Sequence, residues 1–407
     1  MELILSLKDE LSAVSDPRVL GRTRHNLMDV LILGVLAIIC QAETWNDIED
    51  FGHAKEEWLR KFLELPNGIP SHDTISRVFS LIEPTEFELA FISWMNQVRI
   101  DRGVGDTFCI DGKVVKGTIE SNRGHGRKSL NIVSVWSTMQ GLVLGQMRAS
   151  GGGNAETSAA IELLNLLNIE GVTIVGDAGI GKPSVIDKIL DKGGQYIFPI
   201  KTNTRPMYNK VDELFSKYKE KNSTSKKVTT HSIIEKGHGR HEERSATVIR
   251  LENLPENINT IESTGRTQIN GLKAIGRIVY ESKEKETRPF IQINGKYESP
   301  KNKLRTKKEV RYFVTSLNLD TKELMEKLRL QWSIESKLHW VLDVSLNEDG
   351  NRTRNKIAAE NLSLVRKIAL NLVNQDKKSK AGVKRKLKRC GWDNAYLEEL
   401  LFKKSLG

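Results

Sequence analysis

The chain has 407 residues, which is enough for roughly two to four domains. Hydrophobic residues make up 38% and charged residues 28%, and Gly and Pro are too few for a disordered or fibrous protein. Lys and Arg outnumber Asp and Glu by 63 to 52, so the net charge of +11 predicts a polyanionic partner, nucleic acid before an acidic membrane surface. A basic surface with no such partner is the alternative.

The three cysteines are widely separated, at Cys40, Cys109 and Cys390, and none lies in a CxxC spacing. This argues against a disulfide framework and a cysteine zinc site, and it suits a reducing compartment. The opening residues MELILSLKDE reach an acidic residue too early for a signal peptide. The apolar run at 31–40 is too short to cross a bilayer. We therefore expect a cytoplasmic, nucleoid-associated protein without a membrane segment.

Residues 1–100 are expected to form a helical N-terminal domain with a DNA-binding or associated role. Apolar periodicity predicts helices at 27–39, 54–65 and 71–82, with the breaker PNGIP between the last two and Ser71 as an N-cap. Two helices joined by a tight turn, with His72 and Arg77 exposed, are typical of a DNA-reading unit. A plain helical hairpin gives the same pattern, and the pattern alone favours it.

Residues 101–205 change to strand patterns and are expected to form the first part of an α/β core. FCIDGKVVKGT is interpreted as two strands around Asp-Gly, and LNIVSVWST and GLVLGQMRA follow as alternating strands. A helix at 156–167, the strand VTIVGD, a helix from Pro183 and the strand QYIFPIKTN come next. This order predicts an α/β fold with a mixed sheet.

The rest of the chain divides into three expected segments. Residues 206–310 are predicted to be a mostly β insertion, and 311–375 to return to the core with its last strand and helices. Asp320 and Glu323 form the pattern of a capping box at the first of these helices. Residues 376–407 are expected to be a basic, mobile arm followed by a helix, because eight of the residues from Lys377 to Arg389 are Lys or Arg.

The sequence LRLQWSIESKLHWVLDV at 328–344 predicts a helix with an unusual acidic residue. Helical spacing places Glu335 on the same face as Leu328, Trp332, His339 and Leu342. We expect this apolar face to pack inward. An ionised carboxylate on it then needs a cation, a metal or a cluster of donors.

Two further acids end apolar strands. Asp111 follows FCI, where an Asp-Gly hairpin turn is the simpler interpretation, and Asp177 ends VTIVGD, where capping of the next helix is the alternative. If Asp111, Asp177 and Glu335 cluster, their charges repel one another and need compensation. Oxygen ligands suit Mg²⁺ or Mn²⁺, and two such ions catalyse phosphodiester chemistry. In a basic protein this set predicts phosphoryl transfer on nucleic acid.

Two other motifs offer competing interpretations. GDAGIGK at 176–182 matches the start of a phosphate-binding P-loop, but Pro183 follows where Ser or Thr is needed to ligate Mg²⁺. His238 and His241 in EKGHGRHEER are candidate zinc ligands without a convincing cluster. We favour a basic hairpin in which Arg240 and Arg244 contact DNA phosphates.

Three blocks of sequence carry a family resemblance. They are SDPRVLGRTRHNLMDVLILGVLAIICQAETWNDIEDFG with WLRKFL and GIPSHDTISRVFS; IDGKVVKGT with IVGDA and YIFPIKTN; and WSIESKLHWVLDVSLNEDGNRTRN. The chain thus resembles the H-repeat-associated family of bacterial insertion-sequence DDE transposases. The resemblance implies an RNase H-like core, a β insertion between the second and third acids, and the catalytic and metal-binding acids Asp111, Asp177 and Glu335. It also implies a homo-oligomer acting on double-stranded element ends and target DNA.

Two places depart from the family pattern. Gln331 stands where the family usually has His, and GIGKPS follows the second acid block where the family usually has a Gln-containing segment. Gln331 and His339 lie one turn to either side of Glu335, and we predict that both contact DNA. The resulting hypothesis is a transposase that uses two Mg²⁺ or Mn²⁺ ions to cut and rejoin DNA. The alternatives are a metal-dependent nuclease of the same fold, which only hydrolyses, and a DNA-binding remnant that no longer cuts.

Overall fold

The computed structural model of the chain describes residues 2–19, 21–99, 105–120, 128–200, 205–221, 228–237, 240–250, 252, 260–262, 266–285, 291–293, 296–298 and 304–402. These residues divide into two compact units. The first unit is Met1–Ile174 with Asp191–Gly194 and Leu330–Gly407, and the second is Val175–Leu190 with Gln195–Arg329. Within the described ranges, no helix combines the length and apolar character needed to cross a membrane.

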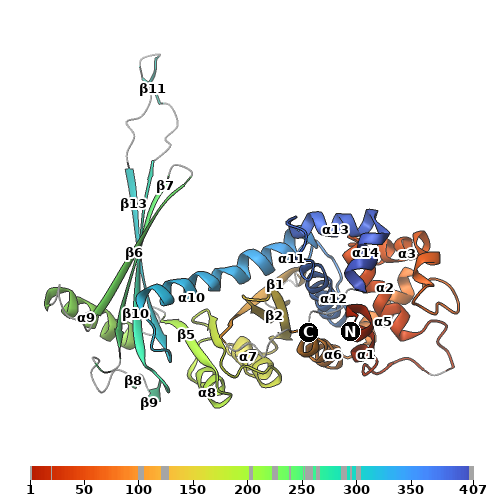
Figure 1. Ribbon diagram of the computed structural model, residues 1–407, viewed down its shortest axis with the longest axis horizontal. Coiled ribbons are helices and arrows are strands. Elements are labelled where there is room, and N and C mark those ends of the chain that lie inside the picture. Colours follow the sequence, from red (N-terminus) through yellow and green to blue (C-terminus); the bar gives the residue numbers. More distant parts are fainter. Residues whose placement is uncertain are drawn as a thin grey trace. The chain divides into compact units, whose positions relative to one another are not determined.

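The first unit opens with helices and continues with strands, and it also holds the last helices of the chain (Figure 1). Its elements are α1 Leu3–Leu11, α2 Leu27–Ile39, α3 Trp45–Ala54, α4 Glu56–Leu59, α5 His72–Leu81, α6 Pro84–Val98, β1 Thr107–Glu120, β2 Lys128–Ser137, β3 Leu142–Arg148, α7 Ala155–Leu166, η2 Glu335–His339, α11 Trp340–Ser345, α12 Lys356–Asn374, α13 Val383–Trp392 and α14 Asn394–Leu401.

The second unit contains most of the predicted β insertion. Its elements are β5 Gln195–Ile200, α9 Arg205–Lys221, β6 Val228–Gly237, β7 Arg240–Arg250, β8 Thr260–Glu262, β9 Arg266–Gln268, β10 Ala274–Lys285, β11 Ile291–Ile293, β12 Lys296–Glu298 and β13 Leu304–Thr315. Three further elements have residues in both units, namely β4 Thr173–Gly176, α8 Pro183–Asp191 and α10 Thr321–Ile334.

Strand β1 is continuous through the predicted hairpin turn. It pairs antiparallel with β2 from Phe108 opposite Ser137 to Val115 opposite Leu130, without a break at Asp111. β2 pairs with β3, and the strand order in this unit is β3-β2-β1-β4. The turn interpretation of Asp-Gly is therefore wrong, and Asp111 lies in mid-strand.

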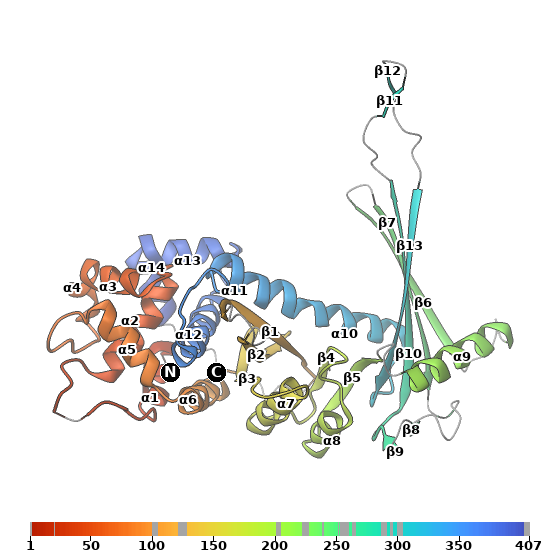
Figure 2. The ribbon, with the colours of Figure 1, turned by 180° about the vertical axis from the view of Figure 1, so that it is seen from behind.

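Helix α12 is the centre of the first unit and is buried from Ala358 to Val373. Its polar side chains serve as connectors, because buried polar groups need partners. Asn361 donates to the carbonyls of Phe79 and Ile82 at the end of α5, at 3.0 Å each. Asn371 accepts from the backbone N–H of Val143 on β3 at 2.9 Å. These bonds attach the strands and the N-terminal helices to α12, which lies between them (Figure 2).

The second unit is built on long antiparallel strands in the order β5-β13-β10-β7-β6. β10 pairs with β13 from Ala274 opposite Thr315 to Lys285 opposite Leu304, and it pairs with β7 on its other side. β13 runs without interruption from Leu304 to Thr315. The strand expected at YFVTSLNL is thus the end of a longer strand.

The predicted capping box is confirmed, whereas two predictions about helices are corrected. Asp320 and Glu323 form the capping box, with the backbone N–H of each residue donating to the carboxylate of the other. The helix predicted at 54–65 is reduced to the four residues of α4. The expected mobile basic arm instead contains helix α13, which buries Lys386, Leu387 and Cys390. Its amphipathic spacing provides an apolar face that packs, and this outweighs the repulsion between its cations.

Glu88 on α6 gives a test of the buried polar core. Burial raises the pKa of Glu88 to about 8, although the Gln146 N–H donates to its Oε1 at 2.7 Å. A folded pKa above the unfolded value means that stability is lost as pH rises from about 4.5 to 8. Glu88→Gln should therefore stabilise the protein at pH 8 by on the order of 1–3 kcal/mol, and the gain should vanish near pH 4.5. Urea unfolding at both pH values measures this.

The exposed Glu83, at the start of the same helix, provides the matched control. Glu83→Gln should give no pH-dependent change in the free energy of unfolding. A Glu88→Gln protein that is less stable than the parent at pH 8 would contradict the account of the buried carboxyl.

Candidate active site

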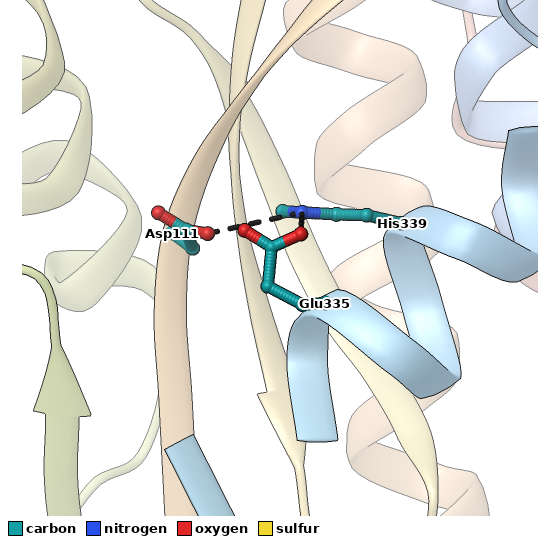
Figure 3. A group of neighbouring side chains, drawn as sticks. All are labelled: Asp111, Glu335 and His339. Atoms are coloured by element: carbon teal, nitrogen blue, oxygen red, sulfur yellow. Dashed lines mark ion pairs between the residues drawn. The ribbon is translucent and has the colours of Figure 1, made fainter. Parts of the chain in front are cut away.

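Asp111, Glu335 and His339 converge in the first unit (Figure 3). His339 Nδ1 lies 3.5 Å from Glu335 Oε2 and 3.8 Å from Asp111 Oδ2. One ligand atom from each of the three residues lies within 4.8 Å of the others. The structure therefore brings together two of the three predicted acids and a histidine that the sequence predicts only as a DNA contact.

Strand β1 holds Asp111 in a fixed position. Its backbone pairs with Ser134 on β2, and the N–H of Gly112 donates to Asp111 Oδ1 at 2.9 Å. A Cβ at position 112 would lie 2.9 Å from Glu156 Oε1, so glycine lets α7 approach the strand beside the acid. The side chain of Asp111 keeps 21% of its surface exposed and can reach a ligand from solvent.

A π-helical turn, η2, carries both Glu335 and His339. In such a turn the hydrogen bonds span five residues, and side chains four residues apart lie on the same side of the helix. Glu335 and His339 are its first and last residues and face Asp111 together. π-turns inserted into α-helices are frequent at functional sites, and this one carries two residues that could ligate a metal.

The buried face of this helix differs from the predicted one. Leu324 and Leu328 are buried early in α10, Ser333 and Ile334 are buried at its end, and Leu338 and Leu342 are buried after it. Trp332 is 49% exposed, and the Glu335 side chain is 66% exposed. The expectation that Glu335 and Trp332 pack inward is thus wrong, because the buried face has already moved to Ser333 and Ile334 before the π-turn begins.

His339 differs from its two neighbours in being buried, with 5% of its surface exposed. Burial lowers the pKa of His339, opposed by the nearby Glu335 carboxylate, so the imidazole is neutral at neutral pH. Among the described residues, its Nε2 has no hydrogen-bond partner. A neutral imidazole has a nitrogen lone pair that can bind a metal ion, whereas a protonated imidazole would repel the ion.

These three side chains fit a divalent metal ion. Carboxylate oxygens and imidazole nitrogens are common ligands of such ions. At metal–ligand distances near 2.1 Å, two ligands of one ion are at most about 4.2 Å apart. The separations of 3.5 and 3.8 Å from His339 Nδ1 meet this limit without movement of the backbone.

Asp177 belongs to the second unit, so its sharing of a metal with Asp111 and Glu335 remains a prediction. Its Oδ1 accepts the N–H groups of Gly179 and Ile180, both at 2.9 Å, and its carbonyl accepts that of Gly181. Two amides of the P-loop-like GDAGIGK segment thus point at their own carboxylate rather than toward a phosphate. This geometry argues against the nucleotide-binding alternative.

Arg77 and Gln331, two of the residues predicted to contact DNA, lie on helices. Arg77 is exposed on α5, and Gln331 is half-buried on α10, four residues before Glu335. The side chain of His72 is 42% exposed, but its ring Nδ1 lies 2.6 Å from Glu49 Oε2. Of the two residues predicted to face DNA in this region, His72 is paired with a carboxylate, whereas Arg77 has no carboxylate at ion-pair distance among the described residues.

The insertion candidates lie on strand β7. Arg244 is bound to Glu242 at 3.0 Å and packs over the ring of Tyr280, with 5.5 Å from its guanidinium carbon to the ring centroid. These contacts fix Arg244 in place, and its role at a DNA phosphate stays a prediction. His238 and the side chains of Arg240 and His241 lie outside the described residues.

Sequence reasoning missed a buried ion cluster beside the site. Lys113 Nζ lies 2.6 Å from Asp343 Oδ1, 2.7 Å from Glu348 Oε2 and 3.3 Å from Asp349 Oδ1. Since Lys113 is two residues beyond Asp111 on β1, both side chains lie on the same face of the strand. Strand alternation and the acids of NEDG were the available signals. Lys113 therefore connects the strand of Asp111 to the segment that follows the π-turn.

This ion cluster is charged despite its burial. Burial raises the pKa of Glu348, but Lys367, Lys113 and Arg366 outweigh it and lower that pKa to about 2. Burial lowers the pKa of Lys367 to about 8. Ser363 bridges the two, donating to Glu348 Oε1 at 2.6 Å and accepting from Lys367 at 2.8 Å. A buried carboxylate this well surrounded stays ionised.

Two family matches cover most of the chain. The family described as DDE_Tnp_1-associated matches residues 8–95, and the family described as Transposase DDE domain matches residues 102–372. The second match includes Asp111, Asp177, Glu335 and His339. A DDE domain of this kind implies an RNase H-like core.

Relatives match over nearly the whole length. "Putative transposase YncI" of Escherichia coli O157:H7 is 35% identical over 403 residues, covering 98% of this chain and 95% of the relative. "H repeat-associated putative transposase YhhI" of Escherichia coli K12 is 34% identical over 397 residues, covering 97% of each chain. A shorter relative, "Inactive transposase YbfQ" of the same strain, is 43% identical over 74 residues, which is 18% of this chain and 88% of the relative.

Lys113→Met tests the ion cluster. Removing the ammonium leaves Glu348, whose side chain is 1% exposed, without its direct cation. Lys367 and Arg366 then offset the Glu348 charge only in part. Loss of an ion-pair partner is costly for a buried charge, so the free energy of unfolding in urea should fall by on the order of 3 kcal/mol.

Lys116→Met is the matched control, because Lys116 is also on β1 and pairs with Asp349 at 2.7 Å but is 72% exposed. Exposed ion pairs contribute little, so this variant should unfold like the parent. Equal stability of the two variants would show that the Lys113 contacts are not structural.

Proposed function

The chain belongs to the DDE transposase family, and we propose that it cuts and rejoins DNA at the ends of its own insertion element, with Asp111, Asp177 and Glu335 as the catalytic, metal-binding acids. The observation that carries the proposal is the convergence of Asp111 and Glu335 from a mid-strand position and a π-turn. The net charge of +11 supports a polyanionic substrate.

The chemistry follows from what these residues can hold. Asp111, Glu335 and His339 would bind a divalent cation such as Mg²⁺ or Mn²⁺, and Asp177 would complete a site for two ions. Bound metal supplies charge neutralisation at the phosphate and a lowered pKa for the attacking oxygen. The acids therefore need no separate general base, and neutral His339 adds a nitrogen ligand without adding charge.

Two balanced steps make up the reaction. Water attacks the phosphodiester at the element end, a new P–O bond forms, and the bond from phosphorus to the 3′ oxygen breaks, leaving a 3′ hydroxyl. That hydroxyl then attacks a target phosphodiester, joins the element to the target, and releases the target's own 3′ oxygen with a proton. Gln331 lies on α10 one turn before Glu335, and we propose that it contacts the DNA at this site.

We extend the proposal to the assembly and location of the protein. A second copy on the paired element end would let one complex cut both ends, and this would place a homo-oligomer on double-stranded DNA at the nucleoid. The family resemblance supports this part of the proposal.

Cleavage of labelled element-end duplex with Mg²⁺ tests the proposal. Parent protein should give strand-transfer products, whereas Glu335→Gln and Asp111→Asn should lose at least about a thousandfold in rate, since a neutral amide removes the negative charge that holds a divalent ion. Asp177→Asn should behave in the same way.

The products separate the alternatives. Nicking without joining would indicate a nuclease, and binding without cleavage would indicate an inactive remnant. A Glu335→Gln protein as active as the parent would remove Glu335 from the mechanism.

His339→Leu tests the nitrogen ligand independently of activity. Its affinity for Mn²⁺, followed by electron paramagnetic resonance, should fall at least about tenfold, because even groups supporting metal ligands typically contribute that much. Lys337→Leu, on the same π-turn but exposed, should bind Mn²⁺ like the parent. Unchanged Mn²⁺ affinity in a folded His339→Leu protein would show that His339 is not a ligand.

A further inference from the structure

An open hollow of about 730 Å³ lies in the first unit, between residues 17–19 and 22–25 on one side and helix α5 on the other. Arg77, Thr74 and Ser71 line it from α5 and its N-cap, and Arg18, Arg22 and Arg24 line it from the facing segment. None of the described lining residues is acidic. We refer to this feature as the basic hollow.

Its cations differ in whether they are already neutralised. Arg18 is paired with Asp16 at 2.7 Å. Arg22, Arg24 and Arg77 are exposed, and in the part of the chain that the structure describes no carboxylate lies within ion-pair distance of them. Three guanidinium groups without counter-charges repel one another, so the arrangement becomes favourable when an anion enters.

The segment that carries Arg22 and Arg24 is attached to the turn before α5. Asn67 donates to the Arg24 carbonyl, and Asn26 donates to Glu64. The carboxylate of Asp29, 4% exposed, accepts the N–H groups of Glu64 and Leu65 at 3.2 and 2.8 Å. The cations are therefore presented from a fixed loop, which lowers the entropy cost of binding a ligand.

Polar groups also line the basic hollow beside its arginines. Ser71 is the N-cap of α5, accepting the N–H of Thr74, so the helix begins at the hollow with its partially positive end. His25 also lines the hollow, and its buried Nδ1 has no hydrogen-bond partner among the described residues. Arginine, Ser or Thr hydroxyls and helix N-termini are the usual protein contacts to DNA phosphates.

We propose that the basic hollow binds consecutive phosphate groups of a DNA duplex backbone, and this inference rests on DNA being the substrate of the proposed function. A hollow of about 730 Å³ is the size of a pocket for a drug-sized ligand, which exceeds the need of one free phosphate ion. Guanidinium groups arising from two separate segments, 22–24 and α5, suit an extended chain of phosphates. Contacts of this kind position the duplex without reading its sequence.

Binding of a fluorescent duplex without divalent metal tests the site separately from cleavage. The triple variant Arg22→Gln, Arg24→Gln, Arg77→Gln should bind at least about tenfold more weakly near physiological salt. The slope of log affinity against log salt should become shallower by about 0.9 for each phosphate that the variant no longer neutralises, or roughly 2 to 3 in all. The weakening should be similar for element-end and unrelated duplexes.

The matched control is Arg60→Gln. Arg60 lies in the same helical region but is paired with Glu56 at 2.6 Å, so its replacement changes the net charge without removing a cation from the basic hollow. It should keep the parent slope. Inorganic phosphate at constant ionic strength should compete only weakly, whereas strong competition would identify a site for the free ion and overturn the proposal.

The outcomes separate this site from the catalytic proposal. A shallower slope supports the hollow whether or not the parent cleaves DNA. An unchanged slope in a triple variant that folds like the parent overturns the hollow and leaves the catalytic acids unaffected. A variant that loses binding to phosphatidylglycerol vesicles but keeps its duplex affinity would overturn it in favour of a lipid surface. A parent that binds no duplex would overturn both proposals.

Discussion

The Lys113 ammonium, held by Asp343, Glu348 and Asp349, is the contact on which the geometry of the first unit's site depends. It joins strand β1, which carries Asp111, to the segment immediately after the π-turn. Transfer of Glu348 from water into the core is costly, and Lys113, Lys367 and Arg366 compensate for it together. The same cluster that stabilises the unit therefore sets the spacing of its two acids.

Behind this cluster, α12 connects the site to the rest of the first unit. Its Lys367 donates to Gln146 on β3 at 2.6 Å, and its Asn361 holds the end of α5. Helix α5 in turn lines the basic hollow. One buried helix thus supports both the acids proposed to bind metal and the surface proposed to hold the DNA backbone. Satisfied polar networks of this kind favour a single, rigid arrangement, which suits chemistry that needs fixed ligands.

Much of this organisation could be predicted from local patterns. Helix α2, the capping box at Asp320 and the strands of the insertion follow from periodicity and capping chemistry, and Glu335 is conspicuous as an acid among apolar residues. Two features could not be predicted in this way. The buried face of α10 moves to Ser333 and Ile334 just before the π-turn at 335–339, so Trp332 and Glu335 are exposed where a constant buried face would turn them inward. Lys113 and Glu348 are 235 residues apart, and only the fold brings them together.

The most direct test of the central claim is a crystal structure of the protein with Mn²⁺, using anomalous scattering to locate the metal. We expect a manganese ion bound by carboxylate oxygens of Asp111 and Glu335 and by Nδ1 of His339. Manganese bound only elsewhere, with Asp111 and Glu335 making no metal contact, would contradict this claim.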